Sequence, residues 1–211
     1  MNASPRPAPT QCLFRRIIGA AYDKLPDQIR ALHDGGSYLS STGQADVVHG
    51  PGFWAGLAIL FSSLPAKGRN VPVTVEFITE RNGERWRRNF NSRIFASRLS
   101  ATAGGKPLLV ERYGVVRVTY ELVPDPHGIT WRQVGMRIFG VPAPRFLRLN
   151  ISARESVEHG RYVFDSNVAL PSGARIVHYR GWLMADEPIS QIPQLHIADP
   201  PSTTAPPATS S

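Results

Sequence analysis

Two glutamates that interrupt apolar segments are the residues best placed to do chemistry. Glu76 lies in the run VTVEF and Glu111 in LLVERYG, and Arg88 and Arg180 could pair with them. Such an ion pair, with Trp86 on the same strand face as Arg88, could hold the polar group of a ligand inside a barrel. A structural salt bridge is the alternative. A catalytic site built from Glu76, Glu111 and Arg180 would require the three side chains to meet in one cleft.

The hexapeptide RWRRNF at residues 85–90 interleaves aromatic rings with cations. A platform for single-stranded nucleic acid uses rings to stack on bases and cations to contact phosphates. Alternate residues of a strand face opposite sides, so Trp86 and Phe90 share a face that Arg85 and Arg87 do not. The sequence therefore favours a core role for the two rings over nucleic-acid binding.

Motifs that identify other kinds of active site do not occur in the chain. It has no G-x-G-x-x-G fingerprint, no phosphate-loop lysine motif and no G-x-S-x-G elbow. The six histidines are scattered singly, and Cys12 is the only cysteine. An internal disulfide, a cysteine-based zinc site and an iron–sulfur cluster are thereby excluded. We expect no metal and no cofactor, and we lean against an enzyme, although residues of distant strands could still converge.

The charge of the chain comes almost wholly from arginine. Its net charge is +8, and its 24 basic residues are 21 Arg and 3 Lys. Arginine pairs with phosphates and with carboxylates, so nucleic acid, an anionic membrane and surface salt bridges all suit this composition. The longest apolar run, residues 53–64, is about half as long as a bilayer span. No signal-peptide pattern opens the chain, and we expect a soluble, cytoplasmic protein.

Hydrophobic alternation with a period of two organises the chain after residue 70. In VPVTVEF, residues 71–77, every second residue is large and apolar, and Glu76 faces the other side. Asn82-Gly83 predicts a type I′ turn that leads into a return strand ending at Phe90. Further segments bring the total to about ten strands with short connections. We predict a mainly β fold, a long antiparallel meander that is strongly curved or barrel-like because closure removes exposed edges.

Three helices are expected beside this sheet. The spacing of apolar residues predicts helices over residues 11–22 and 26–32, with His33 at the end of the second as a capping or hydrogen-bonded residue. Residues 53–64 are predicted to form an apolar helix in the mouth of the sheet or across its concave face. Residues 1–9 and 187–211 are predicted as disordered tails around a single domain, residues 10–186.

Two strands carry features that affect which face each side chain occupies. Parity places Trp131 on one face of its strand and Val134 and Met136 on the other. Gly181 within a strand predicts a bulge or a close approach of another backbone, which would re-aim Arg180.

Seven short motifs follow one another along the chain in the order that is typical of one protein family. They are Leu25-Pro26 with Arg30-Ala31-Leu32-His33-Asp34, Gly43 to Asp46-Val47, Val71-Pro72-Val73-Thr74-Val75-Glu76-Phe77, Gly83-Glu84-Arg85-Trp86, Leu109-Val110-Glu111-Arg112-Tyr113-Gly114, Gly160-Arg161-Tyr162-Val163-Phe164-Asp165 and Tyr179-Arg180-Gly181-Trp182-Leu183. In this respect the chain resembles a bacterial family catalogued as domain of unknown function 4166. The resemblance implies no known activity and no established catalytic or binding residue.

The same resemblance bears on partners. In some relatives a similar domain is fused to a dinucleotide-binding, saccharopine-dehydrogenase-like reductase. This chain lacks the dinucleotide fingerprint, so the resemblance implies that any reductase partner is a separate protein.

The sequence thus favours a non-enzymatic module that binds a small, partly apolar or amphipathic ligand or serves a partner enzyme. Its candidate ligand-binding residues are Glu76, Trp86, Arg88, Glu111 and Arg180. An enzyme with a site assembled from distant strands is the alternative, followed by nucleic-acid binding through the arginines. The sequence predicts neither the identity of the ligand nor the oligomeric state.

Overall fold

The computed structural model describes residues 12–50 and 65–186. Three short helical segments come first: α1 (Leu13–Ile18), the 3₁₀ helix η1 (Gly19–Lys24) and α2 (Asp27–His33). The strands are β1 (Tyr38–His49), β2 (Gly68–Glu80), β3 (Gly83–Phe90), β4 (Arg93–Ala101), β5 (Leu109–Tyr113), β6 (Val116–Asp125), β7 (Gly128–Ile138), β8 (Val141–Pro142), β9 (Asn150–Glu158), β10 (Arg161–Ala169) and β11 (Arg175–Ala185).

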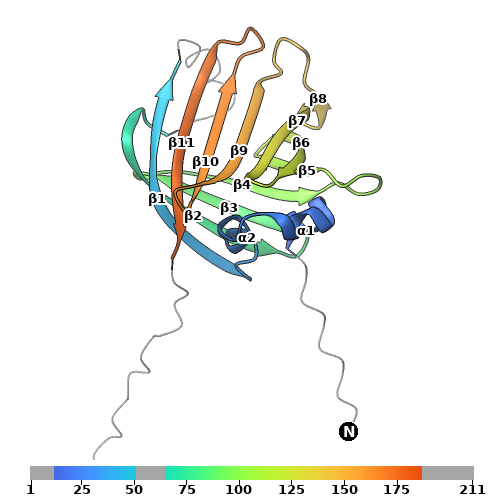
Figure 1. The fold of residues 1–211 in the computed structure, drawn as a ribbon. Helices are drawn as coiled ribbons and strands as arrows, with labels where there is room; N and C mark the ends of the chain where they lie inside the picture. Colours follow the sequence, from blue (N-terminus) through green and yellow to red (C-terminus); the bar gives the residue numbers. More distant parts are fainter. Residues whose placement is uncertain (1–11, 51–64, 187–211) are drawn as a thin grey trace, which may run out of the picture.

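The strands form one antiparallel sheet that closes on itself (Figure 1). Neighbours along the chain pair from β1–β2 to β6–β7 and from β9 to β11, and β11 pairs with β1. β8 has only two residues and pairs with β7, which also pairs directly with β9. Ten strands therefore make a closed barrel, in which each of the ten has a partner on both edges. The prediction of a mainly β, barrel-like meander is confirmed.

One face of each strand points into the barrel, as the period of two predicts. In β2, Val73 and Val75 are buried, and in β3, Trp86 and Phe90 are buried. The residues between them are half-buried or exposed. Apolar side chains from all around the ring therefore meet in one core inside the barrel.

The helices cover one end of the barrel, at the bottom of Figure 1. α1 packs against β4 and β6, and α2 packs against β9 and β10. Phe14 of α1 is fully buried, with its ring centroid 5.9 Å from that of Trp86 and 5.7 Å from that of Trp131. The second predicted helix is confirmed as α2, but the first is divided. At Gly19 φ is +69°, a conformation that suits glycine and ends α1, and the chain continues as η1.

The opposite end of the barrel is where β1 ends and β2 begins (Figure 1). The apolar helix predicted for residues 53–64 lies outside the described residues, and so do the tails predicted for residues 1–9 and 187–211. No helix in the described part of the chain combines the length and the apolar character that a membrane crossing requires.

The first hairpin turns one residue earlier than predicted. Glu80 pairs with Gly83, so the turn consists of Arg81 and Asn82. Neither turn residue has a positive φ, and the predicted type I′ turn at Asn82-Gly83 is therefore wrong. Glycine is required at position 83 for another reason, because a Cβ there would lie 1.9 Å from the carbonyl oxygen of Leu99 on β4.

A bulge in β7 changes which of its residues face the core. The register with β6 shifts between Thr119 and Tyr120, and Val134 is left without a partner in the ladder. Trp131 before the bulge and Met136 after it are both buried. The prediction that these two side chains face opposite sides is therefore wrong, since one extra residue reverses the parity of the strand.

Gly181 allows two strands to approach closely without a bulge. A Cβ at this position would lie 2.3 Å from the carbonyl oxygen of Gln44 and 2.7 Å from the ring of Phe164. β11 runs past β1 in regular register here, with Gly181 opposite Ala45. The close approach is confirmed, and Arg180 keeps the strand face that simple alternation assigns to it.

Candidate ligand cavity inside the barrel

A cavity occupies the inside of the barrel between β2–β7 and β9–β11. Most of the side chains on its wall are aromatic or aliphatic, among them Phe77, Trp86, Phe90, Phe95 and Trp131. The cavity volume is about 90 Å³, which leaves room for several water molecules or a small ligand. An apolar wall of this kind with a few polar groups is typical of small-molecule sites.

Arg88 and Glu111 in the cavity wall, together with Ser97, which bonds both, form a polar group that we call the cavity cluster. They lie on the neighbouring strands β3, β4 and β5, and each faces the barrel interior. Arg88 donates from Nη1 to Ser97 Oγ at 2.9 Å and from Nη2 to Glu111 Oε1 at 3.1 Å. Ser97 Oγ donates to the same Glu111 oxygen at 2.7 Å. The cluster is thus a closed triangle of charge-assisted hydrogen bonds.

The guanidinium of Arg88 also lies over two aromatic rings. Its Cζ is 4.9 Å from the ring centroid of Trp86 and 5.4 Å from that of Phe95. Burial by itself lowers the pKa of Arg88, but the Tyr113 hydroxyl and the Glu111 carboxylate outweigh burial and raise that pKa above its ordinary value. Arg88 therefore keeps its charge inside the barrel.

Three tyrosines add hydroxyl groups to the same wall. Burial raises the pKa of Tyr113, Tyr120 and Tyr179, and the negative charge of Glu111 adds to the rise at each. Their hydroxyls therefore keep their protons at neutral pH and remain able to donate hydrogen bonds.

A second buried polar group lies under the helices, and we call it the plug cluster: His33, Glu84 and Glu155. His33 Nε2 is 2.8 Å from Glu155 Oε2, and the His33 ring stacks on Phe14 with 3.6 Å between centroids. Trp86 donates from Nε1 to Glu84 Oε2 at 2.8 Å. The interpretation of His33 as a hydrogen-bonded residue at a helix end is confirmed.

Burial shifts the pKa values of the histidine and of Glu84 in the plug cluster in opposite directions. It lowers the pKa of His33, but the charge of Glu155 and its hydrogen bond outweigh burial, so that the pKa of His33 is raised above 6.5. Burial raises the pKa of Glu84 above 4.5, against the opposing charge of His33 and the Trp86 hydrogen bond. Both shifts favour the protonated forms in the folded protein.

Trp131, whose ring lines the cavity, carries a buried donor that is not satisfied by any described residue. Its Nε1 is buried and has no hydrogen-bond partner within residues 12–50 and 65–186. Its ring centroid is 5.8 Å from that of Trp86 and 5.5 Å from that of Tyr120, both of which also line the cavity. Trp86, in contrast, uses its own Nε1 on Glu84.

The structure separates the five candidate residues into two sets. Trp86, Arg88 and Glu111 lie together on the cavity wall. Glu76 faces outward, where it accepts hydrogen bonds from Arg87 Nη1 at 2.9 Å and from Tyr38 at 3.1 Å. Arg180 also faces outward and donates to Glu158 at 2.6 Å. The pairing of Glu76 with Arg88 or Arg180 is therefore wrong, and so is a catalytic site formed by Glu76, Glu111 and Arg180.

Three functional-site residues were missed from the sequence, each for a different reason. Ser97 shares a strand face with Phe95 and Leu99, which was a usable signal. Glu155 contacts His33 from 122 positions along the chain, a separation that no local pattern reports. Strand alternation placed Trp131 on the face opposite Met136, so Trp131 could not be assigned to the cavity without the position of the bulge.

The arginine-rich run of β3 is divided between the two faces of the sheet. Trp86 and Phe90 are buried inside the barrel, whereas Arg85 and Arg87 are exposed outside it and pair with Glu80 and Glu76. The rings of Trp86 and Phe90 are thus not on the outer surface that carries Arg85 and Arg87.

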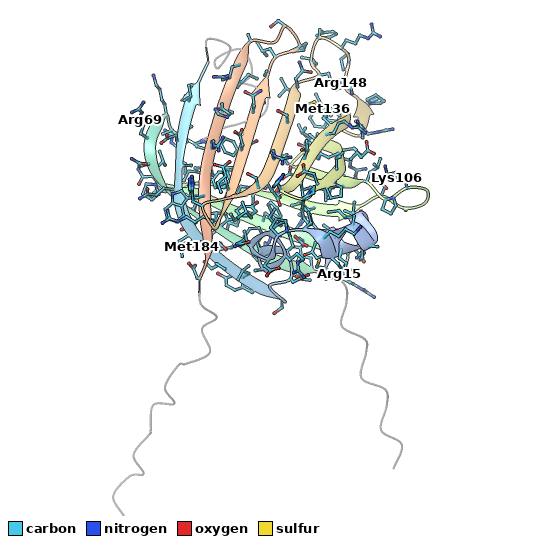
Figure 2. The ribbon with its side chains drawn as sticks, in the orientation of Figure 1. Arg15, Arg69, Lys106, Met136, Arg148 and Met184 are labelled. Atoms are coloured by element: carbon cyan, nitrogen blue, oxygen red, sulfur yellow. The ribbon has the colours of Figure 1, made fainter. Side chains whose placement is uncertain are left out.

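The basic side chains are also spread around the molecule. Arg15, Arg69, Lys106 and Arg148 lie at well-separated places around the barrel in Figure 2. In the described ranges, no group of three His, Cys, Asp or Glu side chains is placed to hold a metal ion.

Comparison with known proteins gives one match. Residues 25–183 match the model of a family described as domain of unknown function (DUF4166). Comparisons with curated proteins and with solved structures find no match. The family description names no activity, so the geometry of the cavity is the basis for any statement about function.

Proposed function

The chain belongs to the DUF4166 family, a domain of unknown function, and from that premise we propose that it binds a small, partly apolar ligand inside its barrel without catalysing a reaction. The observation that carries this proposal is the cavity of about 90 Å³, walled mostly by aromatic and aliphatic side chains and bordered by the cavity cluster. Up-and-down β-barrels large enough to leave internal space commonly use it for ligands.

The chemical state of the wall supports binding rather than catalysis. Arg88, Ser97 and Glu111 bond one another, so the charged groups of the cavity cluster satisfy each other in the unliganded barrel. The tyrosine hydroxyls hold their protons because burial raises their pKa values. A general base or a nucleophile needs a pKa tuned toward the working pH, and the pKa values of the three tyrosines are shifted away from it.

Native mass spectrometry of the protein purified from its own host tests the proposal. We expect the wild-type chain to carry a small molecule that is released on unfolding. Ala153→Leu adds volume to the cavity wall and should abolish retention of that molecule. Ser152→Leu, at the neighbouring exposed position of β9, is the matched control and should retain it. Retention by Ala153→Leu equal to that of the wild type would contradict binding in the cavity.

A further inference from the structure

The charged residues along the cavity already have partners. Arg154, Glu155 and Asp165 pair with Asp125, His33 and His178, and Arg88 pairs with Glu111. Arg88 keeps its positive charge, and the carboxylate of Glu111 lies 3.1 Å from its Nη2. Glu111 is 2% exposed, so its charge is compensated by Arg88 and Ser97 rather than by bulk water. An anionic ligand that approached Arg88 would also approach Glu111, and it would have to break the existing pair before it could form its own.

A cationic ligand meets the opposite obstacle. Aromatic walls attract cations over the faces of their rings. Here Arg88 itself lies over Trp86 and Phe95, at 4.9 Å and 5.4 Å from their ring centroids. Two of the ring faces are therefore already occupied by a cation of the protein, and the charge of Arg88 would repel a second cation that approached them.

The rest of the wall suits an apolar body. Phe77, Phe90 and Trp131 line it, and the Trp131 ring lies 5.8 Å from that of Trp86 and 5.5 Å from that of Tyr120. Burial of apolar surface against such rings stabilises a complex without any charge on the ligand.

From these three observations we infer that the ligand is an uncharged molecule with an aromatic or aliphatic body. Carboxylates and ammonium compounds of the same size are discriminated against. This inference rests on the proposed function and specifies the chemical class of ligand that the cavity takes.

Three one-ring probes of nearly equal size distinguish the classes: benzyl alcohol, benzoate and benzylammonium. Their affinities for the full chain at neutral pH are measured by calorimetric titration, and the indole signal of Trp131 in ¹H–¹⁵N spectra reports whether each probe enters the cavity. Trp131→Phe identifies that signal. We expect benzyl alcohol to shift it and to bind about tenfold or more tightly than either ion.

The outcomes separate this inference from the proposed function. If benzoate or benzylammonium shifts the Trp131 signal and binds as tightly as benzyl alcohol, the inference is overturned while the proposed function stands. If no probe shifts the signals of cavity residues, both are overturned for ligands that fit the observed volume.

A variant of Glu111 tests the physical reason for the selectivity. Glu111→Gln removes the negative charge but keeps the shape, so Arg88 becomes available to an anion. We expect benzoate to gain about tenfold in affinity and benzyl alcohol to change by less than about twofold. Glu76→Gln, the same substitution on the outer face of β2, is the control and should change neither affinity. An unchanged benzoate affinity in folded Glu111→Gln overturns the charge argument. If that variant does not fold, the three probes on the wild type decide the question.

Discussion

The two buried polar clusters of the barrel contain similar residues but have different surroundings. In the plug cluster, His33 has a side chain with 0% exposure that is pressed against Phe14 beneath the helices. In the cavity cluster, the Arg88 side chain is 11% exposed and borders internal space. Arg88 and Glu111 thus both line the cavity, whereas of the plug cluster only Glu155 borders it, and His33 and Glu84 do not. Burial of a polar pair alone does not identify a site, and the space beside it must be known.

The largest expected difference between the two regions concerns two phenylalanines. Phe14→Ala empties a packed position of the plug and should lower the free energy of unfolding by about 3–5 kcal/mol. Phe95→Ala removes a ring that already faces open space and should cost less than about half as much. Urea denaturation of both variants measures the difference. Equal losses would mean that the two regions are packed alike.

The next effect concerns the charges of the cavity cluster. Arg88→Met leaves Glu111 buried without its cation, and we expect a loss of about 3 kcal/mol in the free energy of unfolding. The double variant Arg88→Met/Glu111→Leu removes both charges and should recover most of that loss.

Arg180→Met on the outer face is the matched control, because its partner Glu158 is exposed to water and such pairs contribute about 1 kcal/mol or less. Chemical denaturation of the three variants measures their free energies of unfolding. A double variant no more stable than Arg88→Met would show that the ion pair is not the reason for the loss.

The smallest expected effect is a pH dependence of the unfolding free energy that arises from the plug cluster. Because the pKa of His33 is raised in the folded state, its contribution to stability is complete below its ordinary value of 6.5 and disappears as the pH rises through the folded pKa. The pKa of Glu84 is raised above 4.5, so its protonation also favours the folded state toward lower pH.

His33→Gln should therefore flatten the decline in the unfolding free energy between about pH 6.5 and pH 9, as followed by denaturation at several pH values. Glu111→Gln should leave the slope of that decline unchanged. A wild-type protein whose stability rises with pH across this window would contradict the direction given for His33.

Much of the barrel could be predicted from the sequence because its strands alternate strictly. The pattern of β2 and β3 placed Trp86 and Phe90 on the face opposite Arg85 and Arg87, as the structure does. The bulge at Val134 was not predicted, although Gly135 beside it was a usable signal, because a glycine within a strand can equally mark a close backbone approach, as Gly181 does.

The candidate site could be predicted only in part. The alternation of strand faces already placed Glu76 on the outer face of the sheet. That alternation alone was enough to separate Glu76 from the buried Glu111. The partner of His33 depends on how α2 docks onto β9, which local sequence does not encode. The internal space is a property of the whole ring, because it depends on strand number and on the side chains of every strand together.

Xenon binding in crystals tests the central claim most directly, because xenon enters apolar space and needs no knowledge of the natural ligand. Crystals of the wild type and of Ala153→Leu would be compared under xenon pressure. We expect a xenon atom beside Phe77, Phe95 and Trp131 in the wild type and none there in Ala153→Leu. A wild-type barrel without xenon in this space, or with xenon only beside Phe14 under the helices, would contradict it.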